Sequence, residues 1–207
     1  MNYSIVKQIL GDAWRAIKFG YLSSRRDKYG YIDPTAIVCQ PTWATKSNMY
    51  LYRNTKIGEN SQINAHKGKF IMKENSRSGM FLTVIAQNHK FKTIGAYPGG
   101  PGWNEEEPAD VIVEEDVWLG TNVTLCPGVH IGRGCVVAAG SVCIKSKEYP
   151  PYSIIGGNPA KFLKFKFTLD EQIEHEKIRF KEENRLPIEL LRNNYERFYK
   201  NKSLVSR

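Results

Sequence analysis

The stretch VEEDVW-LGTNVT-LCPGVH-IGRGCV-VAAGSV, residues 113–142, repeats with a period of six and without a gap. Its first positions, continued one residue beyond the block, are Val113, Leu119, Leu125, Ile131, Val137 and Cys143. Its fifth positions are Val117, Val123, Val129, Cys135 and Ser141. A helix would repeat every 3.6 residues and a simple strand every two, so neither fits. The period predicts an all-β solenoid of short strands and tight corners, three strands to a triangular coil.

The geometry of such a coil assigns a role to each position of the repeat. First-position side chains should point into the prism and stack on their equivalents in the next coil, about 4.8 Å away. The second position is often Gly or Ala, as at Gly120, Gly132 and Ala138. We expect these small residues to permit unusual backbone dihedral angles at the corners.

The same pattern recurs upstream with slips in register. Hexads begin at Ile32, Val38, Leu51, Ile57 and Ile63, and a block shifted by three residues begins at Met72 and continues through Ser78 and Val84. Each slip marks a small insertion. The largest interruption is the loop of residues 90–112, which is rich in Gly and Pro and holds Tyr97 and Trp103. A long loop of this kind in a compact domain is usually functional.

These patterns divide the chain into a helical cap (residues 1–30), the solenoid (31–166, with the loop 90–112 inserted) and a helical segment (167–207). Residues 3–22 carry apolar side chains at helical spacing, which predicts a helix that covers the first coil or, alternatively, lies at a membrane surface. Thr168 and Glu171 form a capping-box pattern that predicts a helix over about 169–184. Pro187 suits the first turn of a second helix at 188–200.

Composition narrows the range of functions. The chain has 207 residues, a formal net charge of +9 and four cysteines without a CxxC pair. No apolar run approaches the roughly 20 residues needed to span a bilayer, and no signal peptide is evident, so we expect a cytoplasmic protein with reduced thiols. The basic residues are scattered rather than interleaved with aromatic residues, which argues against nucleic-acid binding. A phosphate-bearing small molecule is a better match to the charge.

Among the four histidines, His89 is the best candidate for a general base. It ends the first block of coils at the start of the long loop, whereas His130 and His175 fall on positions expected to be exposed. An imidazole with an ordinary pKa of about 6.5 can accept a proton near neutral pH. A zinc enzyme would need three converging histidines, and only His66 and His89 are near the interrupted coils.

Residues 116–163, which include DVWLGTNVTLCPGVHIGRGCVVAAGSVCIKS and IIGGNPAKFL, resemble the hexapeptide-repeat acetyltransferases. The stretch is most similar to the maltose, galactoside, nodulation and surface-polysaccharide O-acetyltransferases. IGENSQINA (57–65) resembles the family segment that ends in an active-site asparagine, here Asn64. IAQNHKF (85–91) resembles the segment that holds the catalytic histidine, here His89. The segment Ile144–Ser153 is longer than is usual in this family.

The resemblance implies a left-handed parallel β-helix, a homotrimer, and acetyl-CoA as co-substrate in a groove between two subunits, without a metal. Carried over by position, Gly120, Thr121 and Ala139 would line the pantetheine arm, and Lys161 and Lys164 would face the phosphates. Trp118 would either pack on the pantetheine arm or fill a corner of the prism. We therefore expect an acetyl-CoA-dependent O-acetyltransferase that acts on a sugar or glycan hydroxyl, in surface-polysaccharide or lipopolysaccharide biosynthesis. The alternatives are an antibiotic acetyltransferase of the same fold and a non-catalytic β-helix scaffold.

Overall fold

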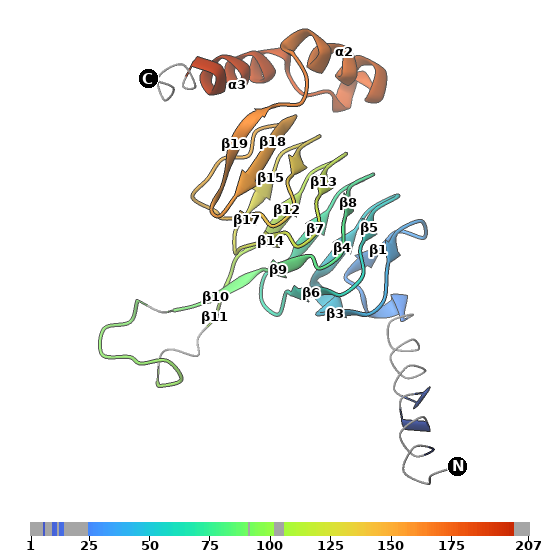
Figure 1. Cartoon of the computed structure of the whole chain (residues 1–207), viewed down its shortest axis with the longest axis vertical. Helices are drawn as coiled ribbons and strands as arrows, with labels where there is room; N and C mark the ends of the chain where they lie inside the picture. The colour runs from blue at the N-terminus through green and yellow to red at the C-terminus, as the bar shows by residue number, and fades with distance from the viewer. Residues whose placement is uncertain are drawn as a thin grey trace.

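A computed structural model of the chain describes residues 6, 10, 11, 13, 14, 25–90, 92–101 and 106–200. Three parallel β-sheets form the faces of a triangular prism, and two helices cover its C-terminal end (Figure 1). The helix predicted over residues 3–22, with its possible membrane contact, lies almost wholly outside the described residues, although Val6, Leu10 and Trp14 are helical. No helix in the described part of the chain is long and apolar enough to cross a membrane.

Each coil contributes one strand to each of three sheets. Sheet A contains β1 (Tyr31–Ile32), β4 (Met49–Leu51), β7 (Phe70–Met72), β12 (Val111–Val113) and β15 (His130–Ile131). Sheet B contains β2 (Ile37–Val38), β5 (Lys56–Ile57), β8 (Arg77–Ser78), β13 (Trp118–Leu119), β16 (Val136–Val137), β18 (Ser153–Gly157) and β19 (Ala160–Phe165). Sheet C contains β3 (Thr42–Ala44), β6 (Ser61–Asn64), β9 (Thr83–Ile85), β14 (Thr124–Leu125) and β17 (Val142–Cys143). The chain visits A, B and C in turn, which makes a left-handed parallel β-helix, as expected.

The inward positions predicted from the hexads are confirmed. All six first-position side chains from Val113 to Cys143 have no exposed surface, and the fifth positions are at most 2% exposed. Equivalent residues stack across coils in parallel register, for example Leu125 between Val84 and Cys143 in sheet C. The upstream register is also confirmed, since Met72, Ser78 and Val84 all point inward. The hydrophobic core is therefore a single column along the prism axis.

The role expected for the second-position glycines was wrong. Gly120 and Gly132 do not have a positive φ, and the left-handed conformation falls instead on the fourth position of most hexads. That position holds residues for which a positive φ is least unfavourable, and their φ values lie between 56° and 76°: Asn54, Asn60, Asn75, Asp116, Asn122, Gly128, Gly134 and Gly140. Asn, Asp and Gly tolerate this region because their side chains are absent or can hydrogen-bond locally. Phe81, with φ +59°, and Tyr152, with φ +60°, are bulky residues that share this conformation.

The second-position glycines are required for a different reason, which is the close approach of the next coil. A Cβ atom on Gly120 would lie 2.6 Å from the backbone nitrogen of Ala139, and one on Gly58 would lie 2.1 Å from the carbonyl oxygen of Gly79. Real Cβ atoms do not come that close to backbone atoms. The small residues therefore let the backbones of neighbouring coils stack directly at the corner between sheets B and C, hereafter the B–C corner.

The insertions that shift the hexad register project from the prism at the corner between sheets C and A, hereafter the C–A corner. At this corner the chain passes from one coil to the next. In the first coil this corner holds the 3₁₀ turn η2 (Lys46–Asn48), and in the second it holds residues 65–69. In the third, β10 (Gln87–His89) and β11 (Glu106–Pro108) form an antiparallel ladder, so that the long loop is an arm rather than a structureless segment (Figure 1). In the fifth, residues 144–152 replace a sheet A strand. The insertions are thus concentrated at one edge of the prism, the C–A corner.

The C-terminal segment closes the open end of the prism. Strand β19 turns back antiparallel on β18, and the helices α2 (Leu169–Arg179) and α3 (Ile188–Lys200) follow, separated by η3 (Glu182–Asn184). Thr168 caps α2 through the predicted capping box with Glu171. The helix ends at Arg179 rather than near residue 184. His175, expected to be exposed, is half-buried because its ring packs edge-on against Tyr152, with ring centroids 5.6 Å apart.

Candidate active site

Asn64 is the last residue of β6, where sheet C meets the C–A corner. Its backbone carbonyl accepts a 2.8 Å hydrogen bond from the N–H of Ala86 in the next coil, which fixes its position. Its side-chain Oδ1 is buried, and no partner for it exists among the described residues. A buried amide oxygen without a hydrogen bond costs about 1–3 kcal/mol. The Asn64 amide is therefore poised to meet a polar group from outside the chain.

The corner that follows Asn64 is held by two side-chain amides that sequence reasoning missed. Asn48 donates to the carbonyl oxygens of Ala65, at 2.8 Å, and His66, at 3.2 Å. From the opposite side, Gln87 Oε1 accepts a 2.9 Å hydrogen bond from the N–H of Lys67. The slips in the hexad register mark this corner, but they do not reveal which amides hold it.

Thr45 is a second polar residue that the sequence did not point to. Ala44 and Ile63 are partners in the ladder between β3 and β6. Thr45 comes directly after Ala44 and Asn64 directly after Ile63, so Thr45 and Asn64 occupy equivalent positions in neighbouring coils. Thr45 Oγ1 is buried and, like Asn64 Oδ1, has no partner within the described ranges. Two unpaired polar oxygens therefore occupy consecutive rungs at the edge of sheet C.

His89 lies at the same corner, one coil beyond Asn64. Asn64 is in register with Ile85 in β9, and His89 ends β10 four residues later. The side chain is exposed, and its backbone N–H donates to Asn88 Oδ1 at 3.0 Å. A cavity of about 410 Å³ opens beside it, lined by His89, Lys90, Lys92, Thr93 and Glu107. The base of the arm thus presents the imidazole to a space of small-molecule size.

The residues expected to contact CoA lie elsewhere, at and beside the B–C corner. Gly120 and Thr121 follow β13 and Ala139 follows β16, so the three occupy neighbouring coils at this edge. Gly120 is buried, whereas Thr121 and Ala139 are exposed. All three residues are small, so none of them places a bulky side chain at this edge.

Trp118 and the two lysines extend this edge towards the C-terminal end. Trp118 is 49% exposed and begins an outward row on sheet B that continues through Val136 and Ile154 to Lys164. Lys161 pairs with Gly156, at the top of the small-residue edge. Both lysine side chains are exposed. The predicted CoA-facing residues therefore form one continuous strip along the prism.

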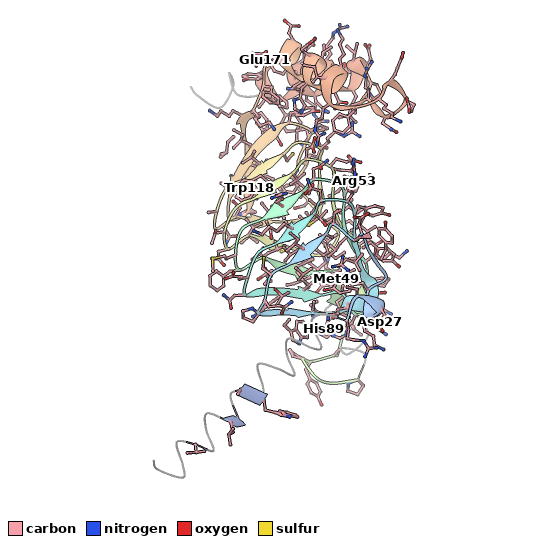
Figure 2. All side chains as sticks on the ribbon, turned by 90° about the vertical axis from the view of Figure 1, so that its right-hand side faces the viewer. Asp27, Met49, Arg53, His89, Trp118 and Glu171 are labelled. Atoms are coloured by element: carbon pink, nitrogen blue, oxygen red, sulfur yellow. The ribbon has the colours of Figure 1, made fainter. Side chains whose placement is uncertain are left out.

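The structure places the two predicted groups at opposite edges of sheet C. Asn64 and His89 follow its strands at the C–A corner, whereas Gly120 and Thr121 precede β14 at the B–C corner. Figure 2 shows the same separation, with His89 near the N-terminal end of the prism and Trp118 higher on another flank. One chain therefore does not bring the proposed base and the CoA-facing strip together. A second copy could supply the missing half.

The described residues offer no set of side chains arranged as metal ligands. No group of three His, Cys, Asp or Glu side chains there is arranged to hold an ion. His130, expected at the surface, is exposed, and its Nε2 lies 2.7 Å from Glu114 Oε1. The imidazole is thus engaged by the Glu114 carboxylate.

Comparison with known proteins agrees with the repeat fold. Residues 110–145 match the family model described as bacterial transferase hexapeptide (six repeats). A probable macrolide acetyltransferase from Lysinibacillus sphaericus is 46% identical over 107 aligned residues, which cover 46% of this chain and 58% of that protein. The chain spans about half the length of the curated relatives it matches, 58% and 47% of the first two.

Two solved structures share the fold. A maltose O-acetyltransferase from Clostridium difficile 630 superimposes with a TM-score of 0.60 at 23% identity, covering 69% of this chain and 73% of that one. A hexapeptide-repeat acetyltransferase from Vibrio cholerae O1, in complex with acetyl-CoA, gives a TM-score of 0.59 at 23% identity, covering 69% and 74%. The hexads, the left-handed prism and these matches agree: residues 110–145 carry bacterial transferase hexapeptide repeats, and the chain has the fold of the hexapeptide-repeat acetyltransferases that it resembles.

Proposed function

We propose that this protein is an acetyl-CoA-dependent O-acetyltransferase with His89 as its general base. The observation that carries the proposal is the placement of His89 and Asn64 at the same edge of sheet C, where His89 lines a cavity of about 410 Å³. The acetyl-CoA complex of the Vibrio cholerae relative supports the choice of donor. The cytoplasmic location expected from the sequence is part of this proposal.

The reaction needs one proton carrier and one oxyanion donor. His89 takes the proton of the acceptor hydroxyl as its oxygen attacks the thioester carbonyl carbon. The Asn64 amide or a nearby backbone N–H stabilises the tetrahedral oxyanion. The C–S bond then breaks, and the proton held by His89 passes to the departing sulfur of CoA. No covalent enzyme intermediate is required, because the thioester is already activated.

A homotrimer completes the site. In a cyclic trimer every interface is heterologous and brings one edge of a subunit against a different edge of its neighbour. The C–A corner of one copy, with His89, then faces the B–C corner of the next, with Gly120, Thr121 and Ala139. Acetyl-CoA lies between them, with its pantetheine arm along Trp118 and its phosphates near Lys161 and Lys164.

The acceptor in this proposal is the hydroxyl of a sugar or glycan, in the assembly of surface polysaccharide or lipopolysaccharide. Tyr97, which is 65% exposed on the arm, is available to stack on a sugar ring. Trp103, singled out for the same role, lies outside the described residues.

A second acceptor class is favoured by a specific observation. The macrolide acetyltransferase relative is 46% identical, well above the 23% of the maltose enzyme, so an antibiotic hydroxyl is an equally supported acceptor. The donor chemistry, the base and the trimer are the same in both cases. The two acceptor classes require different surroundings only around the arm that β10 and β11 form.

The test is an assay of CoA release with acetyl-CoA and a panel of sugars, nucleotide sugars, glycan fragments and macrolides. His89→Ala should lower turnover at least about 100-fold, the usual contribution of a general base. His66→Ala, which removes an exposed histidine at the same corner, is the matched control and should retain activity. Turnover near wild type in His89→Ala would reject the mechanism. Failure to bind acetyl-CoA in calorimetry would instead favour a non-catalytic scaffold.

A further inference from the structure

Phe81 holds a strained backbone conformation while its side chain faces solvent. Its φ is +59°, a value that is uncommon for a bulky residue. The equivalent positions of the neighbouring coils carry Asn60 and Asn122, for which this conformation costs less. The Phe81 side chain is 45% exposed, and Met80 beside it is 40% exposed. Two apolar side chains therefore project from the B–C corner of the third coil.

Tyr152 shows how the fold itself can offset such strain. Its φ is +60°, but its side chain is completely buried and its hydroxyl donates a hydrogen bond to Glu176. Phe81 has a largely exposed ring without a polar group, so the same compensation does not apply to it. Strained residues that the packing does not explain cluster at ligand sites, where the strain serves function.

The backbone at Phe81 is fixed by the coils on either side. The N–H of Phe81 donates a 2.8 Å hydrogen bond to the carbonyl oxygen of Glu59 in the second coil. In the fourth coil, the N–H of Asn122 donates to the carbonyl oxygen of Met80 at 2.9 Å. Coil stacking thus sets the conformation of this corner, and the Phe81 ring is held at its surface.

Phe81 continues the strip of residues expected to contact CoA. Thr121 occupies the same corner in the fourth coil, and the strip runs from there to Lys161 and Lys164 at the C-terminal end. With its phosphates at the lysines, the proposed CoA extends along this edge and brings its acetyl group close to Thr121. Met80 and Phe81 are the next side chains beyond that point.

Phe81 is also level with His89, because both belong to the third coil. Phe81 precedes β9 at the B–C corner, and His89 ends β10, which follows β9 at the C–A corner. In the proposed trimer an edge of one prism runs along an edge of the next, so the three prisms are nearly parallel. Rotation about an axis parallel to the prisms keeps equivalent coils level. Phe81 of one copy then faces His89 of the neighbouring copy.

We infer that Phe81 of one copy lines the acceptor side of the site that contains His89 of the neighbouring copy. The inference rests on the proposed function, since it needs the acetyl-transfer site and the trimer. An aromatic ring beside the Met80 thioether binds an apolar face of the acceptor, such as one face of a pyranose ring or of a macrolide. The imidazole opposite takes the proton of a hydroxyl at the acceptor's edge. The acceptor is thus a molecule with an apolar face and a hydroxyl-bearing edge.

Photocrosslinking tests the placement of Phe81 without depending on catalysis. With p-benzoylphenylalanine in place of Phe81 in the full chain, irradiation should give a covalent dimer, and mass spectrometry should locate the adducts within residues 64–67 or 87–93. The same amino acid at Ile178, which is 77% exposed on α2, is the control and should give no adduct in those segments. Adducts of residue 81 confined to its own chain, or absent from those segments, would overturn the inference.

Kinetics with p-nitrophenyl glucoside, p-nitrophenyl galactoside and erythromycin test the role of the ring. Phe81→Asn should raise the acceptor KM at least about tenfold and change the acetyl-CoA KM less than about twofold, because only the acceptor loses a contact. Phe81→Tyr keeps the ring and should stay within about threefold of wild type, as should the control Ile178→Gln. An unchanged acceptor KM in Phe81→Asn would overturn the inference. A wild-type protein that acetylates none of the three would instead reject the proposed function.

A refolded mixture tests whether the two residues come from different copies. His89→Ala and Phe81→Asn combined in equal amounts leave about a quarter of the sites with both wild-type residues, if each site draws on two neighbours. These sites should appear as a component with the wild-type acceptor KM. Absence of this component would place both residues in one chain's own site and contradict the inference.

Discussion

The hydroxyl of Tyr152 donates a 2.5 Å hydrogen bond to Glu176 Oε1 and so joins the last coil to α2. Both residues are buried, with 0% and 2% of their surface exposed. The other carboxylate oxygen accepts hydrogen bonds of 3.0 Å from Arg133 Nη1 and from the N–H of Leu186. Burial and the neighbouring carboxylate raise the pKa of Tyr152, which keeps its hydroxyl protonated as a donor. Glu176 thus fastens the C-terminal helices to the prism.

Replacing Glu176 with Ala should lower the free energy of unfolding by about 3 kcal/mol, because the Arg133 guanidinium loses the buried one of its two carboxylate partners. Tyr152→Phe should cost about 1 kcal/mol, since Arg133 still satisfies the carboxylate. Glu174→Gln, an exposed change on the same helix, is the control and should lie within about 0.5 kcal/mol of wild type. Urea unfolding measures all three. A Glu176→Ala effect as small as that of the control would show that this contact is dispensable.

Phe81 should be an unfavourable residue at its position. Its φ is +59°, in a row of fourth positions where the neighbouring coils carry Asn60 and Asn122. Its side chain is 45% exposed, so little packing is lost on replacement. Phe81→Asn should raise stability by about 1 kcal/mol. The reciprocal change, Asn122→Phe, should lower stability by a similar amount. Opposite signs for the two variants in thermal unfolding would establish the rule, and a destabilised Phe81→Asn would refute it.

Because the proposed site is shared between neighbouring subunits, a mixture of two inactive variants should regain activity. His89→Ala and Gly120→Trp should each be inactive alone, the first without its base and the second with a blocked CoA edge. Each site draws one group from each of two neighbours, so an equimolar mixture refolded together should recover about a quarter of wild-type turnover. Mixing wild type with His89→Ala provides the calibration. No recovery, with trimers verified by light scattering, would place the whole site within one chain.

The four cysteines should differ in reactivity. Burial raises the pKa of the Cys135 thiol to about 11 and that of the Cys143 thiol to about 12. Both are fully buried, so the reactive thiolate is scarce and inaccessible at neutral pH. Iodoacetamide at pH 8 should leave these two unlabelled in the native protein, while partly exposed Cys39 reacts. Mass spectrometry of native and unfolded samples makes the comparison. Rapid native labelling of Cys135 would contradict the packing described.

Glu114 should contribute to stability only above acidic pH. Burial opposes its ionisation, but hydrogen bonds from His130 and Lys73 outweigh burial and lower its pKa from 4.5 to about 2. A lowered folded-state pKa gives stability that is present above the unfolded pKa and is lost as pH falls from about 4.5 to 2. Glu114→Gln should therefore be about 1–2 kcal/mol less stable at pH 6, and the difference should vanish near pH 2. A difference that is independent of pH would disprove this role.

Much of the fold was open to prediction because the hexad period is a direct consequence of geometry. An inward side chain recurs every six residues in a triangular coil, so Val113 through Cys143 could be assigned to the core without coordinates. The role of the small residues could not be predicted in this way. Whether Gly120 serves an unusual dihedral angle or a close contact depends on how near the next backbone lies, and the distance to Ala139 exists only in the folded chain.

The sequence by itself determined the solenoid, its inward residues, the helix beginning at Leu169, and His89 and Asn64 as candidates for chemistry. These features depend on local spacing and motif. Only the tertiary structure decided that the insertions leave the prism at one corner, that His89 and Gly120 lie at opposite edges of sheet C, and that Arg133 meets Glu176. Those relationships join residues from different coils and from the C-terminal helices. The stacking of the coils sets the distances between these residues. The period of the repeat along the chain does not specify those distances.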